Sequence, residues 1–490
     1  MKTELRPIAS ALLLVISSAP FSTAFGQGSL VPPGPPGPTM KTLDQIEART
    51  PLTNSGAVAI SQSGSYYLTH NITVASGDAI TIAADNVTLD LNGFTISTTT
   101  TTPSGIAIDL VGTRHSISIL NGFIQGSAGT SNGLTINNEF NSGVDYSNAA
   151  PDGARVSGLT VNTVLRHGVY LGLNTSSIQS CFVDNAGDTG LDASFVSDSV
   201  AYNCGTGAGI SGRTINNCNA SSTSSGFGIY AVNANNSAGT SASGVGIEST
   251  YVNYCVGSSA TGDGLDTATA YNSTGGTTST GGANGLYASV LACNCTGNCA
   301  GTGRGLYAPA ALSCVGYSPV GNAVEANTAQ NCYGNTYSAD GVRAKTAENC
   351  YGYTTGNGSG IVVDAAAMNC YGTSAGNGSG ITVSSFGPNN AAFGVAQNCI
   401  GISSSGVGIQ AINVNNCNGT SASGTGISCS GATGSAGQAN GAGSIGINAS
   451  GIVIGCTGTA PNGGLGLSAY IANSSFGTTY NSGIHEYNMP

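Results

Sequence analysis

The sequence repeats itself most clearly in two consecutive stretches, GVRAKTAENCYGYTTGNGS (residues 341–359) and GIVVDAAAMNCYGTSAGNGS (residues 360–379). Each begins with Gly and an aliphatic residue, passes through Asn-Cys-Tyr-Gly and ends in a turn rich in Gly and Ser. The same start recurs from Gly168 to Gly483 with a mean spacing of about 20 residues. A period of this length is typical of a solenoid in which each repeat forms one coil.

The composition indicates which kind of solenoid the chain forms. It has 490 residues with 76 Gly, no Trp and 7% charged side chains. The apolar runs are too short and too rich in Gly, Ser and Thr for helices, and the several Leu per unit of a leucine-rich repeat are absent. Strands of about 3–5 residues suit such runs. We therefore predict an all-β fold, a single-stranded parallel β-helix of roughly 20 coils with an N-terminal cap.

The N-terminal segments precede the repeats. Lys2 and Arg6 stand before the apolar run 8–21, which is typical of a secretory signal peptide. No later run approaches ~20 apolar residues, so we expect an exported mature chain without a transmembrane segment. The predicted divisions are a signal peptide (1–26), a Pro/Gly-rich linker (27–39), a cap with a short helix (40–54), longer-strand coils (55–167) and regular coils (168–490).

Two residue types recur at fixed places in the coils. An Asn follows the repeat Gly by 8–9 residues, and a Cys or Ser follows the Asn. Coils stack about 4.8 Å apart, so we expect an inward ladder of amides beside a stack of small buried thiols. Disulfides between neighbouring coils remain an alternative, since an exported chain with 15 Cys would normally form them. The predicted ladder residues are Asn331, Asn349, Asn369, Asn398, Asn416, Cys314, Cys332, Cys350, Cys370, Cys399 and Cys417.

The charge balance limits the function. With 11 basic and 22 acidic residues the net charge is −11, so we expect no nucleic-acid partner. Apart from Cys and Tyr, the only ionisable residue between Cys350 and His485 is Asp364. A glycosidase needs two carboxylates about 5–9.5 Å apart. The C-terminal third therefore cannot carry that chemistry.

Polar residues concentrate between residues 139 and 213. If the protein is an enzyme, Asp184 with Asp188 or Asp192 would act as acid and base. Arg166 or His167 would then stabilise developing charge. The alternative, which we favour, is a solvated surface patch with one ion pair between Arg166 and Asp188 of the next coil, which contributes little to stability.

Aromatic residues offer candidate ligand contacts. Tyr287 and Tyr307 stand at the same offset in two successive coils, and they would either stack on a glycan or form a ladder within the sheet. Phe386 and Phe393 lie in an insertion that lengthens one coil, where binding loops of solenoids occur. The run TGDGLD (261–266) hints at a Ca²⁺-binding turn, but it is a single copy. We otherwise expect no metal and no cofactor.

The N-terminal strands carry a family resemblance. GSYYLTHNITV (64–74), DNVTLDLNGFTI (85–96) and ILNGFIQG (119–126) resemble the start of bacterial right-handed β-helix proteins of the pectin-lyase-like group. The Asn-Cys-x-Gly coils and the C-terminal sequence YNMP (487–490) resemble an exported subgroup of them. The resemblance implies a right-handed β-helix. It does not imply one activity, because the superfamily includes polysaccharide lyases, glycosidases, adhesins and scaffolds.

Three functions remain open. We favour an exported, non-catalytic scaffold, adhesin-like or carbohydrate-binding, with polysaccharide or cell-surface components as partners. A polysaccharide lyase or glycoside hydrolase with its site within 145–198 is the first alternative. Self-association into a filament or surface layer is the second.

Overall fold

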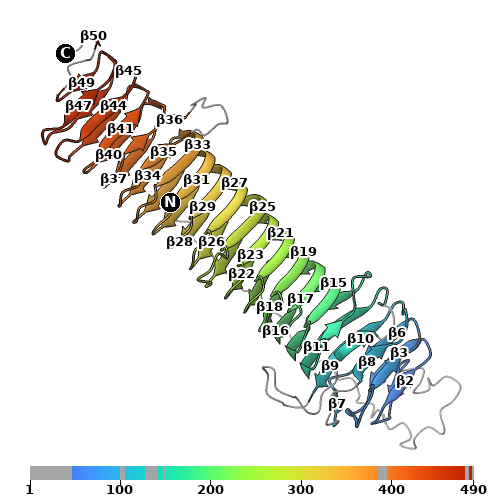
Figure 1. The fold of residues 1–490 in the computed structure, drawn as a ribbon. Helices are drawn as coiled ribbons and strands as arrows, with labels where there is room; N and C mark the ends of the chain where they lie inside the picture. Colours follow the sequence, from blue (N-terminus) through green and yellow to red (C-terminus); the bar gives the residue numbers. More distant parts are fainter. Residues whose placement is uncertain are drawn as a thin grey trace, which may run out of the picture. The chain divides into compact units, whose positions relative to one another are not determined.

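The computed structural model describes residues 47–99, 105–126, 142–146, 150–384, 394–479 and 485–487. The chain divides into two units, Met1–Ala48 and Arg49–Pro490, and all 50 strands lie in the second. The described residues contain no helix, and hence none that is long and apolar enough to cross a membrane. The second unit is a parallel β-solenoid of about 21 turns, which confirms the predicted fold class (Figure 1).

Each coil has three faces, as the coil that begins at Gly341 illustrates. In β31 (Val342–Glu348) the alternation of buried and exposed residues breaks at Lys345 and Thr346. This strand therefore serves two faces, with Val342–Ala344 on face A and Thr346–Glu348 on face B. After a corner at Asn349, β32 (Tyr351–Thr354) forms face C. Strands of successive coils pair in parallel and in register along every face.

The strands of faces A and B pair from coil to coil. Those that begin on face A are β2 (Val58–Ile60), β5 (Ile80–Ile82), β8 (Ile106–Leu110), β10 (Ser142–Tyr146), β12 (Val169–Tyr170), β15 (Leu191–Ser197), β17 (Ile210–Asn216), β19 (Ile229–Asn235), β21 (Ile247–Asn253), β23 (Leu265–Tyr271), β25 (Leu286–Cys293), β27 (Leu306–Leu312), β29 (Val324–Gln330), β31, β33 (Ile361–Met368), β35 (Ile381–Val383), β38 (Ile409–Gln410), β41 (Thr425–Cys429), β44 (Ile445–Ala449) and β47 (Leu465–Ser468). Separate face B strands are β1 (Thr50–Leu52), β3 (Gly64–Leu68), β6 (Val87–Asp90), β13 (Ser177–Gln179), β36 (Val395–Gln397), β39 (Asn413–Asn415), β42 (Gly431–Thr433), β45 (Ile452–Ile454), β48 (Ile471–Asn473) and β50 (His485–Tyr487).

Face C is built from short strands, two of which begin on face B. Its members are β4 (Ile72–Val74), β7 (Thr95–Thr98), the ends of β9 (Ser118–Gln125) and β11 (Arg155–Val164), β14 (Phe182–Ala186), β16 (Val200–Cys204), β18 (Asn219–Ser222), β20 (Ala238–Ser241), β22 (Val256–Ser259), β24 (Thr274–Thr277), β26 (Thr296–Cys299), β28 (Val315–Ser318), β30 (Tyr333–Thr336), β32, β34 (Tyr371–Ser374), β37 (Ile400–Ser403), β40 (Asn418–Ser421), β43 (Ala436–Ala439), β46 (Thr457–Thr459) and β49 (Phe476–Gly477).

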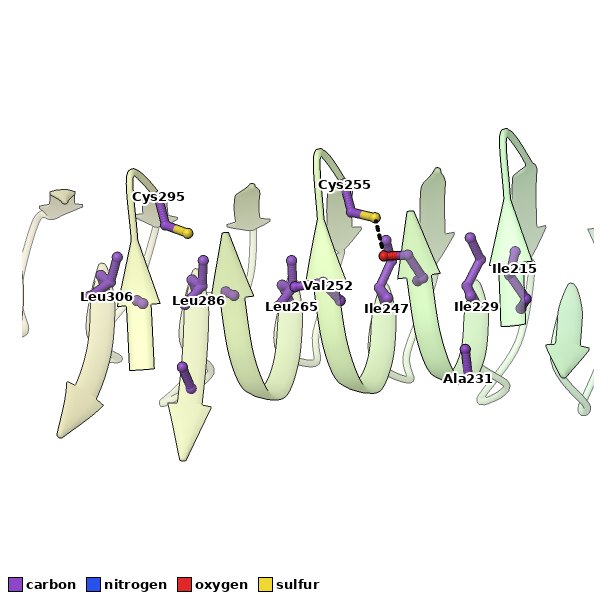
Figure 2. Close-up of a cluster of buried hydrophobic side chains, with 14 of the residues drawn as sticks. Ile215, Ile229, Ala231, Ile247, Val252, Cys255, Leu265, Leu286, Cys295 and Leu306 are labelled. Carbon is purple, nitrogen blue, oxygen red and sulfur yellow. Dashed lines mark hydrogen bonds between the residues drawn. The ribbon is translucent and has the colours of Figure 1, made fainter. Parts of the chain in front are cut away.

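The core is one narrow column of apolar side chains inside the coils. In the coil of Gly341 the buried positions are Val342, Ala344, Ala347 and Cys350. The first of these positions is aliphatic in coil after coil, so the same residue types stack on one another and exclude water along the solenoid. Figure 2 shows this row in Ile229, Ile247, Leu265, Leu286 and Leu306.

Glycines on face C set how closely the coil closes. A Cβ added to Gly275, which faces inward, would lie 2.2 Å from the carbonyl oxygen of Gly285. No side chain fits at that distance. Glycine therefore recurs at the end of the Asn-Cys-x-Gly pattern because the backbone of the coil passes close to it across the interior.

The prediction that the corner asparagines point their amides inward is wrong. Asn331, Asn349, Asn369, Asn398 and Asn416 have φ between 50° and 54°, but their side chains are exposed rather than directed inward. The left-handed corner, which Asn tolerates better than most residues, explains their recurrence. Some of them bond along the outside of the coils, where Asn398 Nδ2 donates to Asn369 Oδ1 at 3.2 Å.

The N-terminal divisions fall mostly outside the described residues. The predicted signal peptide, the linker and residues 40–46 of the cap segment lie there. Within the rest of the cap segment, Thr50–Leu52 forms β1, which pairs with β3 on face B.

Candidate functional site

One line of side chains runs along the outer side of face A, and we call it the outer row. In the coils from Gly168 onward, the row residue is the second residue after the repeat Gly, or after Ala323 where Ala replaces that Gly. From β8 to β31 the strand register brings together Asp109, Asp145, Tyr170, Asp192, Ser211, Tyr230, Glu248, Asp266, Tyr287, Tyr307, Glu325 and Arg343. Carboxylates and tyrosines hold ten of these twelve positions. Beyond Arg343 the row turns neutral, with Val362, Thr382, Gln410 and Ser428.

The N-terminal end of the outer row is buried. Asp109, Asp145 and Asp192 are only 4%, 8% and 7% exposed. The segment before Ser177 packs beside Asp192, where the backbone N–H of Ser194 donates to Ser176 Oγ at 3.0 Å. Burial raises the pKa of Asp192, although hydrogen bonds from Ser211 and Gly172 oppose the rise.

His167 lies next to this buried end. Its Nδ1 is 3.9 Å from Asp188 Oδ2, and its ring stacks on Tyr170 with centroids 4.4 Å apart. Burial lowers the pKa of His167, while the charges of Asp145 and Asp188 act in the opposite direction. The imidazole is therefore neutral at pH 7.

The structure brings only some of the predicted catalytic residues together. The backbone N–H of Asp188 donates to the carbonyl of Arg166 at 2.9 Å, which is the expected coil-to-coil alignment, and the Asp188 carboxylate lies near His167. Asp184, in contrast, lies on face C, where its Oδ1 accepts from Asn203 Nδ2 at 2.7 Å. Asp184 and Asp192 therefore stand on different faces, and the structure does not assemble them as an acid and base pair.

The middle of the outer row is more accessible. Tyr287 and Tyr307 are half-buried and stack on each other with centroids 5.2 Å apart and planes 10° apart. The Arg304 guanidinium lies 5.1 Å from the Tyr307 ring centroid and 2.7 Å from Glu325 Oε2. Burial opposes ionisation of Glu325, but hydrogen bonds from Arg304 and Asn322 lower its pKa overall. The rings thus form a ladder flanked by a fixed ion pair.

Three carboxylates interact just before this ladder. Burial, together with the charges of Asp263 and Glu248, raises the pKa of Asp266 to about 6. Asp263 Oδ1 accepts the backbone N–H of Asn284 at 2.6 Å. The TGDGLD run therefore forms part of the coil's own hydrogen bonding. In the part of the chain that the structure describes, no group of three His, Cys, Asp or Glu is arranged to hold a metal ion.

Most of the cysteines form an interior column, which is unbroken from Cys295 to Cys417 and has Ser at other coils, such as Ser237 and Ser435. All 15 are free thiols, and Cys314, Cys332, Cys350, Cys370, Cys399 and Cys417 are buried. Figure 2 shows Cys255 in this column, with its Sγ 3.3 Å from the carbonyl oxygen of Ala234.

Column side chains also accept hydrogen bonds from the coil before. The backbone N–H of Cys399 donates to Cys417 Sγ at 3.3 Å, and that of Cys417 donates to Ser435 Oγ at 3.2 Å. Burial raises the pKa of the column thiols Cys181 and Cys218 to about 11. The column therefore satisfies buried backbone groups at the corner.

Two further groups of aromatic residues are the two phenylalanines of the predicted insertion and a set of tyrosines on face C. Phe386 and Phe393 lie outside the described residues. A ladder that sequence reasoning missed runs along face C, where Tyr351 stacks on Tyr333 at 5.2 Å and on Tyr371 at 5.1 Å. The threefold recurrence of Asn-Cys-Tyr-Gly could have revealed it.

Comparisons with known proteins add little. No family model matches the chain, and no curated protein matches it. Among solved structures it is similar to a polygalacturonase from Erwinia carotovora ssp. carotovora at 10% identity, over 90% of this chain and 96% of that one. The TM-score is 0.15, so the assignment of the fold rests on the strand pairing of this chain.

Proposed function

We propose that the protein is an exported, non-catalytic scaffold that binds a neutral polysaccharide along its outer row. The observation that carries the proposal is the row itself, in which carboxylates and tyrosines hold ten of the twelve positions from Asp109 to Arg343 on face A. Carboxylates accept hydrogen bonds from sugar hydroxyls, and tyrosines offer an apolar body with a polar tip. Neighbouring positions are about 4.8 Å apart, comparable with the advance of one sugar unit in an extended glycan.

The charge of the row selects the ligand class. Six of its twelve side chains are carboxylates, and Arg343 at its end is the single base. An acidic polymer such as a polyuronate would be repelled along the whole face. A neutral glycan is not repelled by these carboxylates, so we expect the protein to bind it in preference to an acidic one.

The accessible contacts lie between Tyr230 and Arg343. The carboxylates of Asp145 and Asp192 are buried and would contribute to the local electrostatics more than to direct contact. Tyr287 and Tyr307 stack on each other, so a sugar would meet their edges and hydroxyl groups rather than a free ring face. Asp266 and Glu325 flank the pair and would accept hydrogen bonds from the sugar's hydroxyl groups.

A polysaccharide panel tests this proposal. The purified chain is incubated with neutral, acidic and amino-sugar polymers, and both binding and new reducing or unsaturated ends are measured. We expect binding to neutral polymers, at least tenfold weaker binding to polyuronates, and no new chain ends. Stronger binding to polyuronates than to neutral polymers would overturn the proposal.

A hydrolase is the second candidate, and one observation favours it. Asp145, His167 and Asp192 interact electrostatically in a buried site, and His167 Nδ1 has no hydrogen-bond partner among the described residues. If chain ends appear in the panel and disappear in Asp192→Asn, the site is catalytic and the scaffold proposal fails.

A further inference from the structure

Face C differs from the outer row in its charge. From β7 to β46, eighteen strands of this face each place two residues on the outer side, and Asp184 is the only acid or base among them. The strands follow one another along one side of the solenoid, as β16 to β40 show in Figure 1. Depletion of charge over a whole face is typical of the centre of a protein–protein interface.

Large apolar side chains line the same face. The first outward residue is aromatic or aliphatic in eleven of the eighteen strands and Thr or Asn in the other seven. The aromatic and aliphatic positions, which we call the apolar row, are unbroken over five coils from Val315 to Ile400. Exposed members of the row are Phe123, Phe182, Val256, Tyr351 and Ile400, each between 36% and 52% exposed. The strand register aligns these positions coil by coil. Isolated exposed apolar residues need no explanation, but an aligned series marks an interaction surface.

The size of face C suits a stable interface. Eighteen strands spaced about 4.8 Å apart, each about four residues wide at about 3.3 Å per residue, cover about 1,100 Å². A standard interface buries about 800 Å² on each partner. Parallel sheets are also usually covered on both faces, whereas this one has only its inner side packed on the core.

We propose that face C is the contact surface of a homodimer, in which two copies of this chain pack side by side. The occupant is a second copy because the unbroken part of the apolar row, from Val315 to Ile400, advances by one coil at each step. A partner with the same coil spacing can place its own apolar side chains between these at every coil of that part. A two-fold axis would place the same face on both copies. The outer row is carried by other strands, so this inference does not depend on polysaccharide binding.

The test is the mass of the full chain in solution at micromolar concentration. We expect light scattering and sedimentation to give twice the chain mass of 48.0 kDa. The variant Val256→Lys/Tyr351→Lys places two charges in the apolar row and should weaken dimerisation at least tenfold. The matched control Val232→Lys/Val290→Lys changes residues that are 48% and 57% exposed on β19 and β25, and it should remain dimeric.

Three results would overturn the proposal. They are a monomeric wild-type chain, a face C variant that remains fully dimeric, and a control variant that dissociates equally. Circular dichroism on each variant establishes that it is folded. Small-angle scattering separates the geometries, because side-by-side packing enlarges the cross-section, whereas an end-to-end dimer doubles the length and would contradict this arrangement.

Discussion

Individual positions in the coil are selected by backbone conformation as much as by burial. The corner at Asn349 has a φ of 53°, and Asn is chosen there because its side chain tolerates the left-handed region. An inward-facing amide ladder and an outward-facing corner residue both require one Asn per coil, so the sequence spacing does not distinguish them. The position of Asn could therefore be predicted, but its direction could not. Arg304 was missed for a similar reason, since its contact with Glu325 of the next coil depends on the turn.

Asp266 provides a prediction at this scale. Its pKa is raised to about 6 in the folded chain, against about 3.9 in an unfolded one. Between these values the folded state binds more protons, so its stability falls as the pH rises from about 4 to 6. Full desolvation would make this loss about 3 kcal/mol, and solvent screening at a half-buried carboxyl reduces it to about 1 kcal/mol.

The variant Asp266→Asn should therefore be more stable than the wild-type chain at pH 7, by about 1 kcal/mol. The difference should disappear at about pH 3, which lies below the unfolded-state pKa of about 3.9, so that both states of the wild-type carboxyl are protonated. Urea unfolding at the two pH values measures it. A difference that is the same at both values would show that the charge of Asp266 is not its cause.

The strands and coils could be predicted from the sequence more fully than the directions of single side chains. The spacing of Gly and Cys predicted the coil length, the short strands and the buried thiols, because each follows from a local pattern. The outer row was not recognised. Its members look scattered along the chain until the register aligns Tyr170, Asp192 and Ser211. The coils before Gly168 are longer and irregular, so counting from the repeat Gly could not place Asp109 and Asp145 in the row.

Two adjacent glycines test the closure of the coil. Gly275 faces inward, and a Cβ there would lie 2.2 Å from the Gly285 carbonyl oxygen, whereas a Cβ on Gly276 would meet nothing within 4 Å. Gly275→Ala should lower the free energy of unfolding by about 2 kcal/mol through overpacking. Gly276→Ala should be neutral or slightly stabilising. Thermal and urea unfolding of the two variants provide the comparison, and equal effects would contradict the close backbone contact.

At the scale of the whole molecule, the faces of the solenoid carry different chemistry. The outer row bears carboxylates and tyrosines, while face C is almost free of charge. Both contain stacked tyrosines of nearly the same geometry, with centroids 5.2 Å apart for Tyr287 and Tyr307 and for Tyr333 and Tyr351. Their neighbours differ, because Asp266 and Glu325 flank the first pair, whereas Val315 and Tyr371 flank the second. We therefore assign sugar binding to one pair and protein contact to the other.

The most direct test compares these two pairs in binding to a neutral polysaccharide identified in the panel. The double variants Tyr287→Ala/Tyr307→Ala and Tyr333→Ala/Tyr351→Ala remove the same atoms from the two faces, and binding is measured by calorimetry for each. The outer-row variant should lose at least tenfold in affinity per chain, with the face C variant within about twofold of wild type. A tenfold loss in affinity corresponds to about 1.4 kcal/mol of binding free energy. Equal losses in both, or a loss only on face C, would contradict the assignment of the outer row as the polysaccharide-binding surface.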